Sequence, residues 1–354
     1  MSVLAIEIND AGIRVGDPSG RADRRVGSCP GIALIDGGAI LTGSAAADQA
    51  RLKPKRVHDR FWSRLDTSSL SPPFPADLSH ADLAHAQLND IWRRTGSAAS
   101  GVIVVAPGSH SDQQLGLILG IARACGMPVN GLIDAALAAA ALADPPAGGD
   151  PAAGSLLHLD LQRHRVVVTE LTRGAELCRG PVHQSERVGL ASLHATWMRE
   201  IARIFVHRTR FDPLHVAAAE QSLYRQLPGI LASLCRDTGA VVELDAAGKM
   251  HAIELSRQDV AAPAADDYEV MARMVSGRQR PGAEAVLLVS HRAAMLPGLA
   301  QHLDRIGVAA RSDLPAEAAV RGALRHRAQI ESPGAELPFV TRLALGDPAF
   351  PGES

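Results

Sequence analysis

The chain repeats one pattern of elements on either side of a stretch rich in proline and glycine, residues 144–154. Each half begins with the alternation typical of β-hairpins, continues with helical periodicity and ends with a strand, a loop and a helix. Two similar α/β halves with a cleft between them are the simplest fold that such a repeat predicts. In folds of this kind, ligands bind where the carboxyl ends of strands face the cleft.

The expected elements follow from the hydrophobic pattern and from the turn residues. The first half predicts strands at 3–8, 13–15 and 101–106, a hairpin at 31–43, and helices at 44–64, 79–94, 111–125 and 132–142. The second half predicts strands at 156–161, 165–171 and 285–290, a hairpin at 240–255, and helices within 190–235 and at 266–276, 296–305 and 314–326. Residues 337–345 predict a last strand, which is either an edge strand or a docking strand for a partner.

The composition indicates an ordinary globular protein. Of 354 residues, 46% are apolar and 21% are charged, and the formal net charge is −2. Because this charge gives little electrostatic steering and only 3% of residues are aromatic, we expect neither nucleic acid nor a membrane as partner. The four cysteines lie far apart without metal-ligand spacing and no signal peptide is recognisable, which predicts a reduced, cytoplasmic protein. Nothing in the sequence fixes an oligomeric state.

Several segments, in their order and spacing, carry a resemblance to a known family. The first half contains Gly-Ser-Ala-Ala at 43–46, Val-Val-Ala-Pro at 104–107, Gln-Gln at 113–114, Ala-Arg-Ala-Cys-Gly-Met-Pro-Val at 122–129, Leu-Ile-Asp at 132–134 and Ala-Ala-Ala at 138–140. The second half contains Leu-Leu-Val at 287–289, Arg292, Met-Leu-Pro at 295–297 and Pro-Ala-Glu-Ala-Ala-Val-Arg-Gly-Ala at 315–323. Together they resemble the nucleotide-binding domain of the 70-kilodalton heat-shock protein family, which belongs to the actin-like ATPase superfamily.

The resemblance implies an α/β, two-lobed actin-like ATPase fold, in which duplicated ribonuclease H-like domains flank a central cleft. Lobe I would span residues 1–150, with a small subdomain inserted at about 38–98. Lobe II would span residues 151–335, with an insertion at about 200–280, and residues 336–354 would form a C-terminal strand and tail. Because the chain ends soon after the last matched segment, we expect no peptide-binding domain.

The resemblance also places the ATP-binding turns at two hairpins, and both depart from the family's sequence. The first turn would read Asp-Leu-Gly-Thr-Thr, and its residues here are Glu7, Ile8, Asn9, Asp10 and Ala11. The second would read Asp-Leu-Gly-Gly-Gly-Thr, and its residues here are Asp160, Leu161, Gln162, Arg163, His164 and Arg165. The glycines that let backbone amides approach phosphate are absent, and a carboxylate at Asp10 would repel a triphosphate.

Three other functional positions of the family are also altered. The family's lysine falls near Trp62, where no lysine occurs, so that its role is vacant unless Arg60 or Arg64 substitutes. Its general-base glutamate matches Ala135 or, by a slip of one residue, Asp134, which we expect to cap or line a helix. The adenosine motif, which has two glycines in the family, here reads Ser290, His291 and Arg292. Side chains at these positions would crowd the base or the sugar of a nucleotide.

The polar run Arg163, His164 and Arg165 has two interpretations. The simpler one is a solvated hairpin tip. The other is that these side chains fill the emptied cleft, where they would pair with Glu7, Asp10 or Asp160 or bind a different anion through arginine forks.

These departures lead to a hypothesis of a pseudo-ATPase that binds a partner protein or a non-nucleotide ligand and needs no cofactor. The alternative is a divergent, chaperone-like ATPase that binds ATP, with Glu7 and Asp160 holding Mg²⁺ and Arg163 or Arg165 contacting phosphate. A sugar or acetate kinase of the same superfamily is a third hypothesis, which the lost phosphate turns disfavour. The histidines match no metal-ligand pattern, and no G-x-S-x-G motif supports a serine hydrolase.

Overall fold

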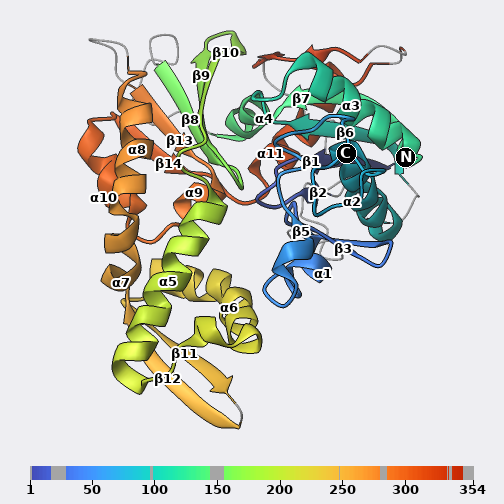
Figure 1. Cartoon of the computed structure of the whole chain (residues 1–354). Helices are drawn as coiled ribbons and strands as arrows, with labels where there is room; N and C mark the ends of the chain where they lie inside the picture. The colour runs from blue at the N-terminus through green and yellow to red at the C-terminus, as the bar shows by residue number, and fades with distance from the viewer. Residues whose placement is uncertain are drawn as a thin grey trace, which may run out of the picture.

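The computed structural model describes residues 2–16, 29–95, 99–143, 155–246, 248–279, 285–332, 334 and 337–345. These residues form a mixed α/β structure with two large sheets and two small ones (Figure 1). The stretch at 144–154, predicted to join the halves, lies outside the described residues. No helix in the described ranges combines the length and the apolar character that crossing a membrane requires.

The first large sheet has the strand order β15-β7-β6-β1-β2. Its members are β1 (Ser2–Glu7), β2 (Arg14–Gly16), β6 (Ala99–Ala106), β7 (Val129–Asp134) and β15 (Phe339–Val340). Strand β1 pairs antiparallel with β2 and parallel with β6, and β6 pairs parallel with β7. Strands covered on both faces have nearly continuous apolar sequences, and Val102, Ile103, Val104 and Val105 in β6 show this pattern.

The second large sheet repeats the arrangement of the first, in the order β14-β13-β8-β9-β10-β16. Its members are β8 (Ser155–Leu161), β9 (Val166–Arg173), β10 (Glu176–Ser185), β13 (Ala285–Val289), β14 (Ala310–Asp313) and β16 (Arg342–Ala344). Strand β8 pairs antiparallel with β9 and parallel with β13, as β1 does with β2 and β6. The first strand of each half is therefore the one that joins its hairpin partner to the later parallel strands.

Helices cover both faces of the large sheets. They are α1 (Gly43–Ala47), α2 (His80–Thr95), α3 (Asp112–Ala124), α4 (Ala135–Leu142), α5 (Leu190–Thr209), α6 (Ala217–Arg236), α7 (Arg257–Ala261), α8 (Ala265–Ser276), α9 (His291–Ala294), α10 (Leu299–Leu303), α11 (Ala318–Arg325) and α12 (Arg327–Ile330). In β1, Leu4 and Ile6 join a core with α2 and α3, whereas Val3 and Ala5 join a second core with α4 and α11. That second core also contains residues of the other sheet, so α4 and α11 lie between the two sheets (Figure 1).

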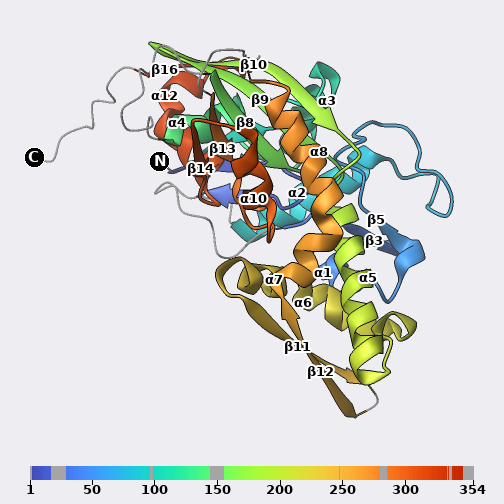
Figure 2. The ribbon, with the colours of Figure 1, turned by 90° about the vertical axis from the view of Figure 1, so that its left-hand side faces the viewer.

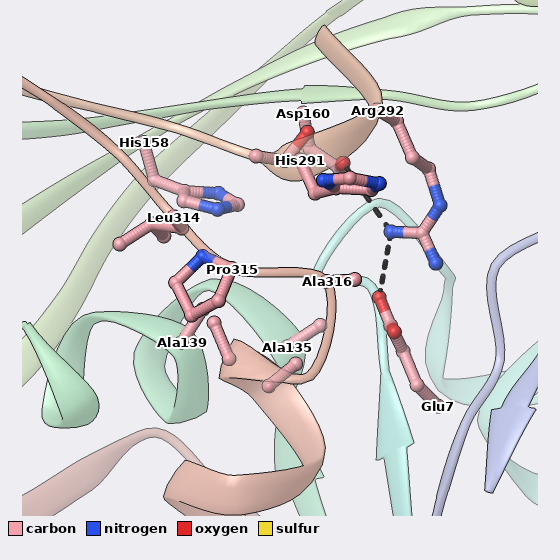
Figure 3. A pocket seen from close by; sticks show the side chains of 13 residues that line it. Glu7, Ala135, Ala139, His158, Asp160, His291, Arg292, Leu314, Pro315 and Ala316 are labelled. Carbon is pink, nitrogen blue, oxygen red and sulfur yellow. Dashed lines mark hydrogen bonds and ion pairs between the residues drawn. The ribbon is translucent and has the colours of Figure 1, made fainter. Parts of the chain in front are cut away.

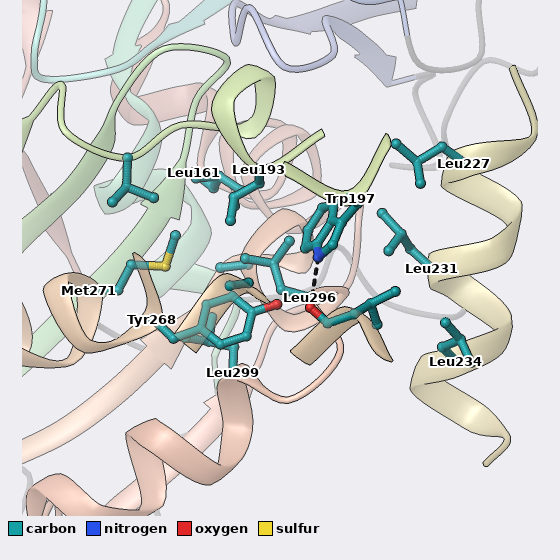
Figure 4. Close-up of a cluster of buried hydrophobic side chains, with 14 of the residues drawn as sticks. Leu161, Leu193, Trp197, Leu227, Leu231, Leu234, Tyr268, Met271, Leu296 and Leu299 are labelled. Carbon is teal, nitrogen blue, oxygen red and sulfur yellow. Dashed lines mark hydrogen bonds between the residues drawn. The ribbon is translucent and has the colours of Figure 1, made fainter. Parts of the chain in front are cut away.

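Two small sheets lie away from this centre. One has the order β4-β3-β5 and contains β3 (Ala33–Asp36), β4 (Ala39–Thr42) and β5 (Val57–His58). The other is the hairpin of β11 (Gly239–Ala246) and β12 (Lys249–Ser256), which packs against α5 and α6 and projects from one end of the molecule (Figure 2). Trp197 of α5 anchors this end, because its indole N–H donates to the carbonyl of Val260 in α7 over 2.9 Å (Figure 4).

Several predicted elements differ from those observed. In residues 44–64 the described helical segments are α1, which ends at Ala47, and a short 3-10 turn at Pro54–Arg56. A single helix over this range would have placed Pro54 in its interior, where proline breaks a helix, whereas here it begins the turn. The helix predicted from residue 132 begins at Ala135 because residues 132–134 complete β7 and Asp134 caps the helix. The last long helix begins at Ala318, and strands β10 and β14 were not predicted.

The last strand is also more complex than predicted. Residues 337–345 form two short strands, of which β15 pairs with β7 in the first sheet and β16 pairs with β10 in the second. Between them, the carbonyl of Thr341 accepts the backbone N–H of Arg179 over 2.9 Å. The edge-strand interpretation is confirmed, and the segment binds both sheets of its own chain.

Helices α4 and α11 approach unusually closely at Gly322. A Cβ atom at this position would lie 1.8 Å from the carbonyl oxygen of Ala138 in α4. A glycine inside a helix costs roughly 1 kcal/mol relative to alanine. The close contact between the two helices explains why glycine occurs here.

We expect Gly322→Ala to lower the free energy of unfolding by about 2 kcal/mol or more, because the added methyl group forces α4 and α11 apart. The matched control is Gly120→Ala in α3, where a Cβ would meet no atom within 4 Å. That substitution should raise stability by roughly 0.5–1 kcal/mol. Urea unfolding of both variants measures the difference, and equal stabilities would contradict the close packing.

Candidate functional site

Two turns, one from each half, face each other beyond the ends of β1 and β8. In the first turn, Asn9 donates a hydrogen bond from Nδ2 to Oδ2 of Asp160 over 2.9 Å. In the second turn, the backbone N–H of Arg163 donates to Oδ1 of Asp10 over 2.6 Å. All four residues are buried. The two halves are therefore joined directly by groups at the positions where the resemblance places phosphate-binding turns.

A buried ion pair lies beside these bonds. Arg292 is in α9, and its Nη1 donates to Oε1 of Glu7 over 2.8 Å (Figure 3). Its Nη2 donates to the carbonyl of Gly12 over 2.9 Å. Nη1 also lies 3.8 Å from Oδ1 of Asp160. Although burial opposes the charge, the carboxylates of Glu7 and Asp160 raise the pKa of Arg292, so that its guanidinium remains charged.

The interpretation of residues 163–165 as a solvated hairpin tip is wrong. Arg163 and Arg165 are only 7% and 6% exposed. Arg163 pairs with Asp59 through Nε and Nη2, at 3.0 and 2.9 Å. His164 donates from Nε2 to the carbonyl of Asp59 over 2.8 Å, and Arg165 donates to Oε1 of Gln184 over 2.7 Å. These side chains fill the space between the halves, but the carboxylate that pairs with Arg163 is Asp59.

Burial of this turn follows from how it meets α5. The N–H groups of Leu190 and Ala191 donate to the carbonyls of Gln162 and Arg163, at 3.0 and 2.8 Å. At Gly189, immediately before the helix, a Cβ would lie 2.6 Å from the carbonyl oxygen of Arg163. A glycine before α5 therefore lets the turn pack against the start of the helix, which shields it from water.

Two carboxyl groups in this region, the buried Asp10 and the partly exposed Asp59, have pKa values that are shifted in opposite directions. Burial raises the pKa of Asp10, although the hydrogen bond from the Arg163 N–H and nearby positive charges oppose the shift. For Asp59, burial acts in the same direction, but hydrogen bonds and charges from His164 and Arg163 outweigh it and lower the pKa. Asp59 is therefore a stable counter-ion, whereas ionised Asp10 is costly to the fold.

The predicted adenosine and metal residues line one narrow cavity (Figure 3). Its free volume is about 20 Å³, which is room for roughly one water molecule. Small residues of α4 and α11 form one wall, and the polar lining consists of Glu7, His158, Asp160, Ser290, His291 and Arg292. Buried polar atoms without a hydrogen-bond partner among the described residues include Nδ1 of His158 and Oδ1 of Asp160. Burial lowers the pKa of His158, which keeps its imidazole neutral.

Other sequence-predicted positions have structural roles. Ser290 caps α9, and Asp134 caps α4 by accepting the N–H of Leu137 over 2.9 Å. This confirms the expectation for Asp134. Gln162 donates to Oγ of Ser109 over 3.3 Å, which adds another bond between the halves. Trp62, near the family's lysine position, is buried.

The sequence did not reveal Asp59 or the contacts at the other end of the interface. There, Gln221 of α6 accepts the N–H of Arg51 over 2.8 Å and donates to the carbonyl of Ala47 over 2.9 Å. The guanidinium of Arg51 also lies over the ring of Tyr224, 4.6 Å from its centroid. A glutamine on a helix surface gives no sequence signal for such a contact, because its partners are backbone groups 170 or more residues away.

The carboxylates do not fit a magnesium ion in this arrangement. Mg²⁺ takes oxygen ligands at near-octahedral positions and usually keeps several waters. Between Glu7 and Asp160, the guanidinium of Arg292 occupies that space. Among the described residues, no three His, Cys, Asp or Glu side chains gather as metal ligands do.

The buried charged groups between the two halves pair with one another, and the cavity beside them leaves little room for a ligand. Its groups are hydrogen-bonded mainly to one another across the two halves. In comparisons with models of protein families and with curated proteins, nothing matched this sequence.

We expect the wild type to become more stable, relative to the Asp10→Asn variant, as the pH falls. The folded-state pKa of Asp10 is raised above its ordinary value of 3.8, so the folded chain binds this proton more tightly than the unfolded chain does. Stability from this group is fully present below pH 3.8 and is lost as the pH rises through the folded-state pKa. Urea unfolding of both proteins at pH 5, 6.5 and 8 gives the difference at each pH.

The control for this experiment is Asp77→Asn, at an exposed position. The Asp10→Asn difference should change with pH by more than the difference measured at this exposed position. A constant difference for Asp10→Asn, or one that grows in favour of the wild type at high pH, would show that Asp10 is not destabilised by burial.

Proposed function

We propose that the chain is a cytoplasmic pseudo-ATPase with a two-lobed, actin-like fold, and that it binds a partner protein or a non-nucleotide ligand. In this proposal the first half is lobe I, the second half is lobe II, and the two turns face each other across the former nucleotide cleft. The protein would neither hydrolyse ATP nor require a metal for its folded state.

The repeated sheet order supports the fold. In both halves a central strand pairs antiparallel with its hairpin partner and parallel with a later strand, as expected for duplicated ribonuclease H-like domains. Helices α4 and α11 pack between the sheets, where a cleft between two lobes would have its floor. The segments that carry the resemblance include both of these helices.

The observation that carries the proposed function is the filling of the cleft by the chain's own side chains. The cavity beside Glu7 and Asp160 has a free volume of about 20 Å³, far too little for a nucleotide. Asn9 bonds to Asp160 and Arg292 bonds to Glu7, so both carboxylates already have partners from the opposite half. A triphosphate would have to break these bonds and separate the two turns.

Two features support binding of a partner rather than catalysis. With the cleft filled, the outer surface is the part of the protein open to recognition. On the projecting hairpin β11–β12, Val241 and Met250 are 61% and 59% exposed, which is high for large apolar side chains.

The cysteines support the cytoplasmic part of the proposal. Cys29, Cys125, Cys178 and Cys235 are all free, as expected for a reduced compartment.

The alternative function, binding of Mg–ATP, is favoured by one observation. The carboxylates of Glu7 and Asp160 both lie within 4 Å of one atom, Nη1 of Arg292, as two carboxylate ligands of a metal would lie near the ion. Under this alternative the lobes open, and Arg163 leaves Asp59 to contact phosphate. Binding would then depend on magnesium and would weaken in Arg163→Gln.

We expect calorimetric titration of the wild type with ATP or ADP, with and without Mg²⁺, to give no binding heat at millimolar nucleotide. The physical reason is that opening the cleft costs the buried bonds at Asp160, Asp10 and Glu7 without new glycine-backbone contacts to phosphate. A thermal melt of the same sample confirms that it is folded. Micromolar binding that requires Mg²⁺ and weakens in Arg163→Gln would replace the proposal with the alternative.

A further inference from the structure

Three oxygen atoms from both halves surround the guanidinium of Arg292. Oε1 of Glu7 lies 2.8 Å from Nη1 and Oδ1 of Asp160 lies 3.8 Å from it (Figure 3). The carbonyl oxygen of Gly12 lies 2.9 Å from Nη2. Glu7 is 4% exposed and Asp160 is 7% exposed. Oδ1 of Asp160 is buried and has no hydrogen-bond partner among the described residues.

Two buried carboxylates cannot both remain charged without a cation between them. Here the guanidinium supplies that charge, and it is covalently part of the chain. The atoms around it are carboxylate and carbonyl oxygens, which are also the ligands that hard divalent cations prefer. The geometry is therefore that of a small oxygen-lined cation site whose position is taken by a side chain.

We propose that Arg292 is a built-in cation that occupies a latent divalent-metal site formed by Glu7, Asp160 and the Gly12 carbonyl. While the arginine is present, the site excludes metal. Removal of its side chain takes away the guanidinium between the carboxylates and opens the position to a hard divalent cation. The inference rests on the proposed function, because it assumes that the wild type does not use Mg²⁺ at this position.

The test uses Mn²⁺, a hard cation whose free and bound forms differ in electron paramagnetic resonance spectra. Wild type and Arg292→Lys should leave added Mn²⁺ free, since both keep a positive charge between the carboxylates. Arg292→Ala should bind one Mn²⁺ per chain, roughly tenfold or more tightly than wild type. Adding Asp160→Asn to Arg292→Ala should abolish this gain, because it removes the carboxylate whose Oδ1 has no hydrogen-bond partner among the described residues.

Loss of the buried ion pair can destabilise Arg292→Ala, so a second measurement keeps the test decisive. Mg²⁺ or Mn²⁺ should raise the melting temperature of Arg292→Ala, or restore its fold, and should not do so for the Arg292→Ala/Asp160→Asn double variant. Arg292→Met, which keeps much of the side-chain volume, should behave as Arg292→Ala does but with weaker metal binding.

Two results would overturn the inference. One is binding of Mn²⁺ by wild type that disappears in Asp160→Asn. The other is that Arg292→Ala gains neither Mn²⁺ binding nor stabilisation by metal. The second result leaves the proposed pseudo-ATPase intact if wild type also fails to bind nucleotide, whereas Mg-dependent ATP binding by wild type contradicts the proposed function itself.

Discussion

The buried guanidinium of Arg292 is the interaction on which the contact between the two halves depends. It joins α9 of the second half to the end of β1 in the first, and it neutralises Glu7 while lying near Asp160. Breaking a buried pair by removing one partner typically costs 3–5 kcal/mol, because the other charge remains in a medium that solvates it poorly. The carboxylates, the turn that carries Gly12 and the short helix α9 are therefore held in place together.

The side chains at residues 9–11 and 162–165, where no glycine occurs, explain why the facing turns bind each other. A glycine-rich turn presents bare backbone N–H groups, which suit a phosphate but leave space when no ligand is bound. Here, side chains at Asn9, Asp10 and Arg163 occupy that space and satisfy each other's polar groups. These side chains therefore supply contacts that keep the two halves together.

Much of the fold could be predicted from the sequence, because apolar alternation marks strands and cores whatever the tertiary partner. The hairpin β11–β12 and helices α2 and α3 were predicted in nearly the observed positions. Strand β10 was missed, since its sequence, Glu-Leu-Cys-Arg-Gly-Pro-Val-His-Gln-Ser, lacks a regular apolar period. At residues 132–134, an apolar run suited both a strand and a helix, and the capping carboxylate of Asp134 determines where one ends and the other begins.

The candidate site was predictable in its members but not in its pairings. The resemblance placed Glu7, Asp160 and Arg292 in different motifs of one cleft, and the structure brings all three to one cavity. The pairing of Arg163 with Asp59 had no sequence signal, because Asp59 lies in an irregular segment whose path depends on the packing around it. Likewise, the polar sequence of residues 163–165 suggested exposure, since hydropathy does not report that α5 will cover a turn.

Polar contacts hold the two halves together at two separate places, and a ligand that binds between the halves would have to break them. At the floor are the bonds of Asn9 and Arg292, and at the far end Gln221 bonds to two backbone groups of the first half. A ligand that enters between the halves must favour the open arrangement over this closed one. If 99 molecules in 100 have the halves together, a ligand that reverses this ratio must bind the open state about 10⁴-fold more tightly than the closed one.

A partner on the outer surface has no such requirement, because it can bind the protein with the two halves in contact. The internal pairing of the buried charges therefore makes binding between the halves more costly in free energy than binding at the outer surface would be.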